Sequence, residues 1–194
     1  LIEPGDAGLL FDDYDDGLSA IPGVSSTFIQ AGTDAVTRTM QDKARDIFSV
    51  KDFGAAGNGS TDDAAAIQAA IDAAYAAGGG TVYFPAATYN FGSPIVINQN
   101  ATTYLSRKNV NIQGDGSSNT VLNYTGAGSA DVALKLIGGS INLGTAAFRN
   151  SLSGFSLKQN AGITGTQTGL WIEQASSIQV TDVQAYQWAT GIYA

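Results

Sequence analysis

One stretch decides the fold of this chain: VKDFGAAGNGSTDD, at residues 50–63. Residues 48–60 predict a short strand followed by a tight turn, because Phe48-Ser49-Val50 is followed by the glycine-rich Gly57-Asn58-Gly59-Ser60. Residues 61–77 then predict a helix. Thr61, Asp62 and Asp63 place capping oxygens and negative charge at its positive end, which favours helix capping over a catalytic pair of acids.

The predicted helix has one apolar face and a clear end. Gly78-Gly79-Gly80 stops it, and the strand at residues 81–84 follows and ends at Pro85. A helix that precedes the first strands in this way is expected to cover the open end of the sheet that they form. The apolar face consists of Ile67, Ile71, Ala74 and Tyr75.

From here the chain is a series of short strands separated by Gly, Asn and Ser. The strands are expected at residues 95–97, 110–112, 133–136, 152–157, 170–172 and 178–180. The segment at 168–172 returns at 190–194, and Leu152-Ser153-Gly154-Phe155 returns loosely as Val180-Thr181-Asp182-Val183. Self-similarity at 20–30 residues predicts a solenoid whose coils cover one another's edges. Because the repeat is cut at Ala194, we expect the natural protein to continue.

Composition excludes several classes of function. The net charge of -8 argues against nucleic acid and anionic membranes as partners, and no run reaches transmembrane length. The absence of Cys and His removes disulfides, nucleophilic triads with His and His-ligated zinc sites. We expect no cofactor and no metal, since Asp12-Asp13-Tyr14-Asp15-Asp16-Gly17 fails the EF-hand template.

Two segments precede the fold-deciding stretch. Residues 1–32 are predicted to be an acidic, irregular extension that packs on a partner or on a neighbouring subunit. Residues 33–47 predict a helix that Thr33 or Asp34 can cap. Its heptad-like stripe favours association with copies of itself over docking on its own domain. The stripe consists of Val36, Met40, Lys43 and Ile47.

The residues from Val50 to Pro85 resemble the opening signature of the pectate lyase-like right-handed β-helix superfamily. The string from Thr37 to Arg45 resembles the neck of phage tailspikes, which precedes that opening. The resemblance implies a mainly β protein: a right-handed parallel β-helix with an N-terminal capping helix (residues 48–194), preceded by a short helical neck (33–47) and a virion-attachment segment (1–32). It also implies a homotrimer in the virion tail, bound to a tail, baseplate or adaptor protein.

Tailspikes of this kind act on host surface polysaccharide, as hydrolases or lyases, but the opening signature carries no catalytic residue. Glycoside cleavage uses two carboxylates facing one groove. The candidates here are Glu173 and Asp182, although an isolated acid on a β surface is more often only solvated. If Leu170 and Ile172 point inward, Trp171 points outward with Tyr193 one coil away, as a candidate sugar contact or as packing against a loop or subunit.

The leading hypothesis is therefore the N-terminal portion of a trimeric phage tailspike, whose full chain depolymerises host polysaccharide while this portion has no complete active site. A non-enzymatic structural or adhesive tail appendage with the same fold is the first alternative. A complete secreted polysaccharide lyase or hydrolase is the second. Fold alone does not choose among them, because function belongs to the site.

Overall fold

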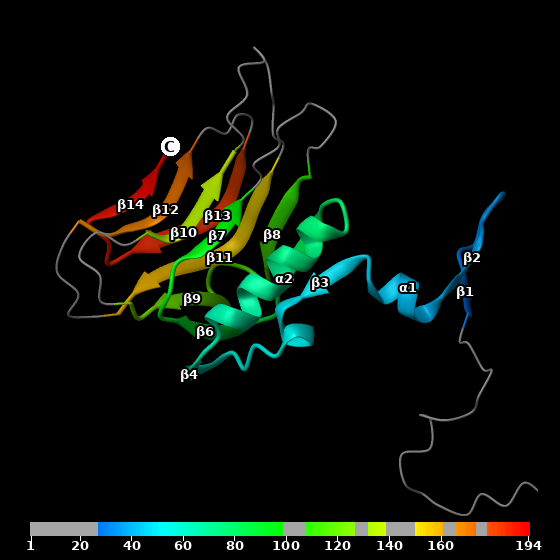
Figure 1. Cartoon of the computed structure of the whole chain (residues 1–194), viewed down its shortest axis with the longest axis horizontal. Coiled ribbons are helices and arrows are strands. Elements are labelled where there is room, and N and C mark those ends of the chain that lie inside the picture. Colours follow the sequence, from blue (N-terminus) through cyan, green and yellow to red (C-terminus); the bar gives the residue numbers. More distant parts are fainter. Residues whose placement is uncertain (1–26, 99–107, 127–131, 139–149, 161–165, 174–177) are drawn as a thin grey trace, which may run out of the picture. The chain divides into compact units, whose positions relative to one another are not determined.

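The computed structural model describes residues 27–98, 108–126, 132–138, 150–160, 166–173 and 178–194 (Figure 1). The chain divides into two compact units, residues 1–44 and 45–194. In the described part of the first unit, β1 (Thr27–Ile29) pairs antiparallel with β2 (Thr37–Thr39), and α1 (Met40–Ala44) follows.

The predicted helix over residues 33–47 is wrong for most of its length. Thr37 and Thr39 are β-branched and lie in β2, so the helix is reduced to the five residues of α1. Ile47 belongs to β3 (Ile47–Ser49) in the second unit. Val36 is 72% exposed, Met40 48% and Ile47 52%. The predicted stripe of Val36, Met40, Lys43 and Ile47 is therefore not the face of one helix.

The second unit is a parallel β-helix, which confirms the predicted fold class. Its strands recur in coils, and nearly every neighbouring pair is parallel and in register. One sheet has four strands in the order β14-β12-β10-β7, and a larger sheet runs β3-β5-β8-β11-β9-β6-β4 with β13 beside β11. The strands are β4 (Asn58–Asp62), β5 (Gly80–Phe84), β6 (Ala87–Phe91), β7 (Ile95–Asn98), β8 (Val110–Gly114), β9 (Thr120–Tyr124), β10 (Val132–Ile137), β11 (Ser151–Gln159), β12 (Thr168–Glu173), β13 (Gln179–Tyr186) and β14 (Thr190–Tyr193).

Both sequence repeats are neighbouring coils of this solenoid. Leu152 pairs with Val180 and Phe155 with Val183 between β11 and β13. In the same way, Thr168 of β12 pairs with Thr190 of β14. Every strand predicted from the sequence is present, whereas β1, β2, β4, β6 and β9 were not predicted, and β1 lies in the extension that was predicted to be irregular. β4 reads NGSTD and all of its residues are exposed, so it carries no apolar pattern from which a strand can be predicted.

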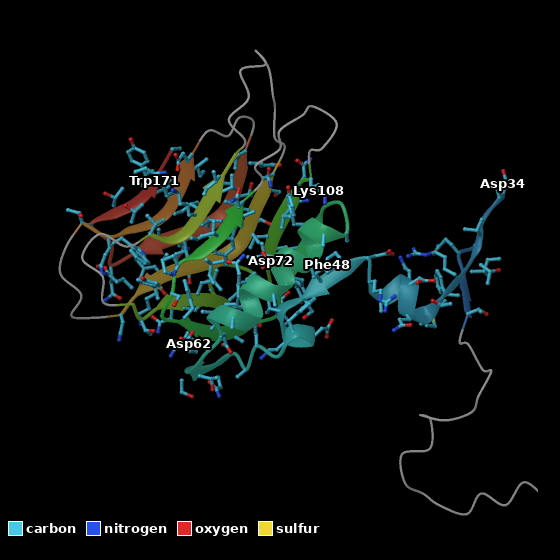
Figure 2. The ribbon with its side chains drawn as sticks, viewed as in Figure 1. Asp34, Phe48, Asp62, Asp72, Lys108 and Trp171 are labelled. Carbon is cyan, nitrogen blue, oxygen red and sulfur yellow. The ribbon has the colours of Figure 1, made fainter. Side chains whose placement is uncertain are left out.

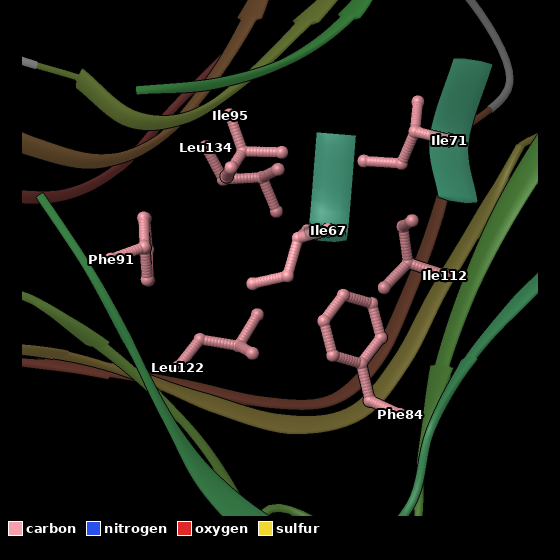
Figure 3. Close-up of a pocket in the computed structure, with 8 residues that line it drawn as sticks. All are labelled: Ile67, Ile71, Phe84, Phe91, Ile95, Ile112, Leu122 and Leu134. Atoms are coloured by element: carbon pink, nitrogen blue, oxygen red, sulfur yellow. The ribbon is translucent and has the colours of Figure 1, made fainter. Parts of the chain in front are cut away.

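The interior is filled by apolar columns that run from coil to coil. Large aromatic side chains pack edge to face, as Phe84 does with Tyr89 at 5.5 Å between ring centroids and Phe91 with Tyr124 at 5.4 Å. A small void near the first coils is wholly apolar (Figure 3). It is lined by Ile67, Ile71, Phe84, Phe91, Ile95, Ile112, Leu122 and Leu134.

The helix α2 (Ala64–Ala76) closes the first coil. Ile67, Ala70, Ile71 and Ala74 are buried, which confirms the predicted apolar face except that Tyr75 is only half-buried. Gln68 pairs with the backbone of Val96 in β7: its Nε2 donates to the Val96 oxygen at 2.9 Å and its Oε1 accepts from the Val96 nitrogen at 3.0 Å. An amide side chain thus takes the place of a further strand at this edge.

The fold-deciding stretch is held by a buried carboxylate. Asp63 is 2% exposed and accepts hydrogen bonds from the backbone nitrogens of Ala56 at 2.6 Å and Gly57 at 3.0 Å. Lys51 donates to the Ala56 carbonyl and lies 5.3 Å from the Tyr89 ring centroid. A Cβ on Gly57 would lie 2.6 Å from the Lys51 Nζ and 2.9 Å from Tyr89, so only glycine fits there.

The prediction that the residues at 61–63 cap the helix is confirmed only for Asp62. The helix begins at Ala64, and the Asp62 Oδ1 accepts from the Ala64 nitrogen at 3.0 Å. Asp63 occupies the N-cap position but makes no capping hydrogen bond with its side chain, because that carboxylate is bound to residues 56 and 57.

A glycine in the left-handed backbone conformation bends β11, so that its first part pairs with β8 and its last part with β9. Gly154 has φ +70°, and a Cβ there would lie 2.5 Å from the carbonyl oxygen of Gly114 in the coil below. The coils can therefore stack at this corner only where the backbone carries no side chain.

We predict that Gly154→Ala lowers the free energy of unfolding by about 3 kcal/mol, because left-handed strain and a backbone clash act together. Gly59→Ala is the matched control. Gly59 has nearly the same φ, +71°, but its nearest neighbours would lie at 3.6 Å. It should cost only about 1–2 kcal/mol. Urea unfolding followed by circular dichroism measures both, and equal losses would rule out the clash.

Candidate functional site

The candidate site lies on the outer face of the four-stranded sheet. Leu170 is fully buried, and alternation along β12 directs Trp171 and Glu173 outward, as predicted. Trp171 is in register with Lys135 of β10 on one side and with Tyr193 of β14 on the other. Figure 2 labels Trp171 at this face of the second unit.

The aromatic pair is stacked along the axis of the solenoid. The ring centroids of Trp171 and Tyr193 are 4.3 Å apart, and their planes differ by 28°. On the opposite side, the Lys135 Nζ lies 6.0 Å from the Trp171 centroid. Trp171 therefore has neighbours along both ring faces, whereas Tyr193 is 51% exposed. Tyr193 is thus the more available surface for a sugar ring, and Trp171 supports it.

Charge and hydrogen-bonding groups surround the aromatic pair. The Lys135 Nζ lies 2.8 Å from the Glu173 Oε2, with both side chains about one third exposed. A pair this exposed contributes little to stability, because solvent screens it. The Trp171 Nε1 is buried and has no acceptor among the described residues. An ammonium, a carboxylate and an exposed ring together suit the hydroxyls and apolar faces of a sugar.

Asp182, the second candidate acid, lies on the other sheet and has a structural partner. It sits in β13 with φ +51°, and its carboxylate accepts from the Ser117 hydroxyl and from the Ser117 nitrogen, the latter at 3.0 Å. The Ser117 hydroxyl, and then the Ser117 backbone, lowers the pKa of the Asp182 carboxyl. Glu173 and Asp182 are therefore in different sheets, and the structure does not bring them together.

Two tyrosines near the first coils, Tyr83 and Tyr89, have raised pKa values. The hydroxyl of Tyr83 donates to Asp115 at 2.7 Å, and this hydrogen bond, followed by burial, raises the Tyr83 pKa. Burial, followed by the charge of Asp63, raises the pKa of Tyr89 to about 12, and its hydroxyl donates to the Pro85 carbonyl. Both phenols stay neutral at ordinary pH and serve as donors rather than bases.

Lys135 was not predicted as a site residue. It lies within a strand segment, ALKL, where only the register with Trp171 one coil away shows that it shares the site. No group of three or more acidic residues in the described ranges is placed to hold a metal ion. The Asp12–Gly17 segment lies outside those ranges. Within them, no helix is long and apolar enough to cross a membrane.

The parallel coils and the helix that caps them define the class of protein: a pectate lyase-like, right-handed parallel β-helix. The family described as rhamnogalacturonase A/epimerase, pectate lyase-like, matches residues 47–193. The chain belongs to this family.

Relatives of two kinds are similar to the chain. Mannuronan C5-epimerase AlgE2 of Azotobacter vinelandii is 51% identical over 85 residues, which cover 44% of this chain and 8% of the epimerase. A capsule KN3-specific depolymerase of Klebsiella phage KN3-1 is 31% identical over 147 residues, covering 73% of this chain and 18% of the depolymerase. The chain thus spans less than a fifth of either relative.

A solved structure shows the same fold. The ORF18 protein of Geobacillus virus E2 superposes with a TM-score of 0.58 at 22% sequence identity, covering 83% of this chain and 32% of that protein. At this identity the likeness concerns the fold alone.

We predict that Asp182→Asn makes the fold less sensitive to acid. Asn tolerates the same left-handed backbone but carries no charge. Because the folded-state pKa of Asp182 is lowered, its carboxylate stabilises the fold at neutral pH, and this contribution is lost as pH falls through that lowered value. The wild type should therefore exceed the variant in stability at pH 7 by more than it does at pH 3.

Urea midpoints at the two pH values measure this difference. Ser117→Ala removes the largest cause of the lowered pKa and should reduce the pH dependence in the same direction. A gap between wild type and Asp182→Asn that is the same at both pH values would contradict the prediction.

Proposed function

We propose that this chain is the N-terminal portion of a phage tailspike whose β-helix recognises a host surface polysaccharide and, in the whole protein, depolymerises it. The similarity to the capsule KN3-specific depolymerase carries this proposal, because it extends over 73% of the chain. The similarity to mannuronan epimerases supports a polysaccharide as the ligand.

Two apolar positions in β13 and β14 are exposed although they lie in register with buried residues. Val180 and Ile192 lie in register with the buried Leu152 and Leu170, yet they are 38% and 45% exposed. These positions belong to the interior columns, and one more coil would bury them. In this proposal the complete active site includes such coils.

The first unit supports self-association. None of its described residues is buried, and a two-stranded hairpin with a five-residue helix is not stable alone in water. Val36 and Met40 expose apolar surface there. We propose that copies of the chain bury this surface in a homotrimer, which residues 1–32 attach to a tail, baseplate or adaptor protein of the virion.

One observation favours an adhesive tail appendage without enzymatic activity. Among the described residues, the two candidate acids Glu173 and Asp182 lie on different sheets. Paired carboxylates in later coils would support the depolymerase. If no product forms when the full-length protein is incubated with a polysaccharide that it binds, the appendage is the better account.

We predict that the chain binds a subset of bacterial capsular and O-antigen polysaccharides on an array, and that Tyr193→Ala weakens binding about fivefold to tenfold. Loss of one aromatic stacking surface accounts for this factor. Gln113→Ala is the control, because Gln113 is exposed on the larger sheet. Equal binding by wild type and Tyr193→Ala would remove the aromatic pair from the site.

We also predict that the chain sediments at three times its mass of 19.9 kDa. Met40→Asp should shift it towards the monomer, because an unpaired charge in a buried contact is costly. Thr27→Asp is the control, since Thr27 is exposed in β1 and lies outside the apolar surface. Sedimentation as a monomer at all concentrations up to tens of micromolar would sink the trimer proposal for this portion.

A further inference from the structure

A second row of outward side chains crosses the larger sheet. Asn90 of β6, Asn123 of β9, Lys158 of β11 and Tyr186 of β13 are in register on four successive strands. We call these four residues the amide–lysine row. Their neighbours along the strands point inward, as Tyr89, Leu122 and Leu157 do, so the row faces away from the core.

Two hydrogen bonds orient the amides of the row. The Asn90 Nδ2 donates to the Gly59 carbonyl at 2.6 Å, which leaves its Oδ1 to accept from the Asn123 Nδ2 at 2.7 Å. Asn123 must therefore present its own Oδ1 away from Asn90. The next member of the row in that direction is Lys158.

Asn123 and Lys158 each have a polar group without a partner among the described residues. The Asn123 Oδ1 is shielded and has no donor among the described residues. Within the described residues, Lys158 makes no ion pair and no hydrogen bond, whereas Lys135 is paired with Glu173. An acceptor without a donor and a half-buried cation without an anion both cost free energy.

We propose that the amide–lysine row is a binding site for an acidic sugar residue of a polysaccharide. A carboxylate binds the Lys158 ammonium, and the exposed Tyr186 ring, in register with Lys158 on the next strand, contacts the apolar face of the same sugar. Neighbouring strands lie about 4.8 Å apart, so the span from Asn123 to Tyr186 is about 10 Å. One sugar and its neighbour in a chain fit that length.

Charge sets the character of this binding. The protein carries a net charge of -8, which repels a polyanion at long range, so the attraction comes from Lys158 at short range. The row lies on a different sheet from Trp171 and Tyr193, so either site can bind when the other does not.

The test is a calorimetric titration of the 194-residue chain with oligogalacturonate and, separately, with a neutral oligosaccharide of equal length. Lys158→Gln should weaken oligogalacturonate binding about tenfold, as expected for loss of a charged hydrogen bond. Lys108→Gln is the matched control, because Lys108 lies over the Tyr75 ring at 4.6 Å and away from the row. Side-chain amide resonances of Asn90 and Asn123 should shift with the acidic ligand alone.

Three outcomes would overturn the proposal: no binding of oligogalacturonate at millimolar concentration, equal binding by Lys158→Gln, or equal shifts with the neutral ligand. If Lys158→Gln instead dissociates an oligomer of the wild type, the row is a subunit contact. A loss of binding in Tyr193→Ala that leaves the amide shifts intact would separate the first site from this one.

Discussion

The rest of the structure depends on the hydrogen bonds that the buried Asp63 carboxylate accepts from the backbone. By accepting two backbone hydrogen bonds it holds residues 56 and 57 against the start of α2. That helix can then direct Ile67 and Ile71 into the first coil and bring Gln68 to the edge of β7. A solenoid has an open edge at its first coil, and water or another chain would compete for that edge without such a cap.

Parallel pairing of the strands in register links the position of the capping helix to that of the candidate site. Once β7 is fixed, parallel pairing sets β10, then β12, then β14, and a slip of one residue would turn every side chain to the opposite face. The corner at Gly154 serves the same end in the larger sheet, since it lets one strand continue through the bend without losing register. The Trp171–Tyr193 stack is thus a result of backbone pairing.

The sequence was most informative where one residue pattern had one physical solution. The sequence repeats predicted correctly that Leu152 lies in register with Val180 and Trp171 with Tyr193, because equivalent positions of successive coils stack in a solenoid. It was least informative where tertiary contacts decide. The exposed β4 is a strand only because β6 lies beside it, and the helix predicted from residue 33 is mostly absent because β1 pairs with β2. Lys135 entered the site through register alone, and Asp182 is bound to Ser117, 65 residues earlier.

The residues that identify the family are not those that can act on a ligand. Lys51, Gly57 and Asp63 make contacts that hold the cap, and Asp63 is buried. Function must come from side chains that the coils leave outward, and these differ between the two sheets: Lys135 is neutralised by Glu173, whereas Lys158 is not neutralised within the described coils. A shared fold can therefore present different chemistry on each face, because the pairing of strands fixes positions and leaves the outward residues free to vary.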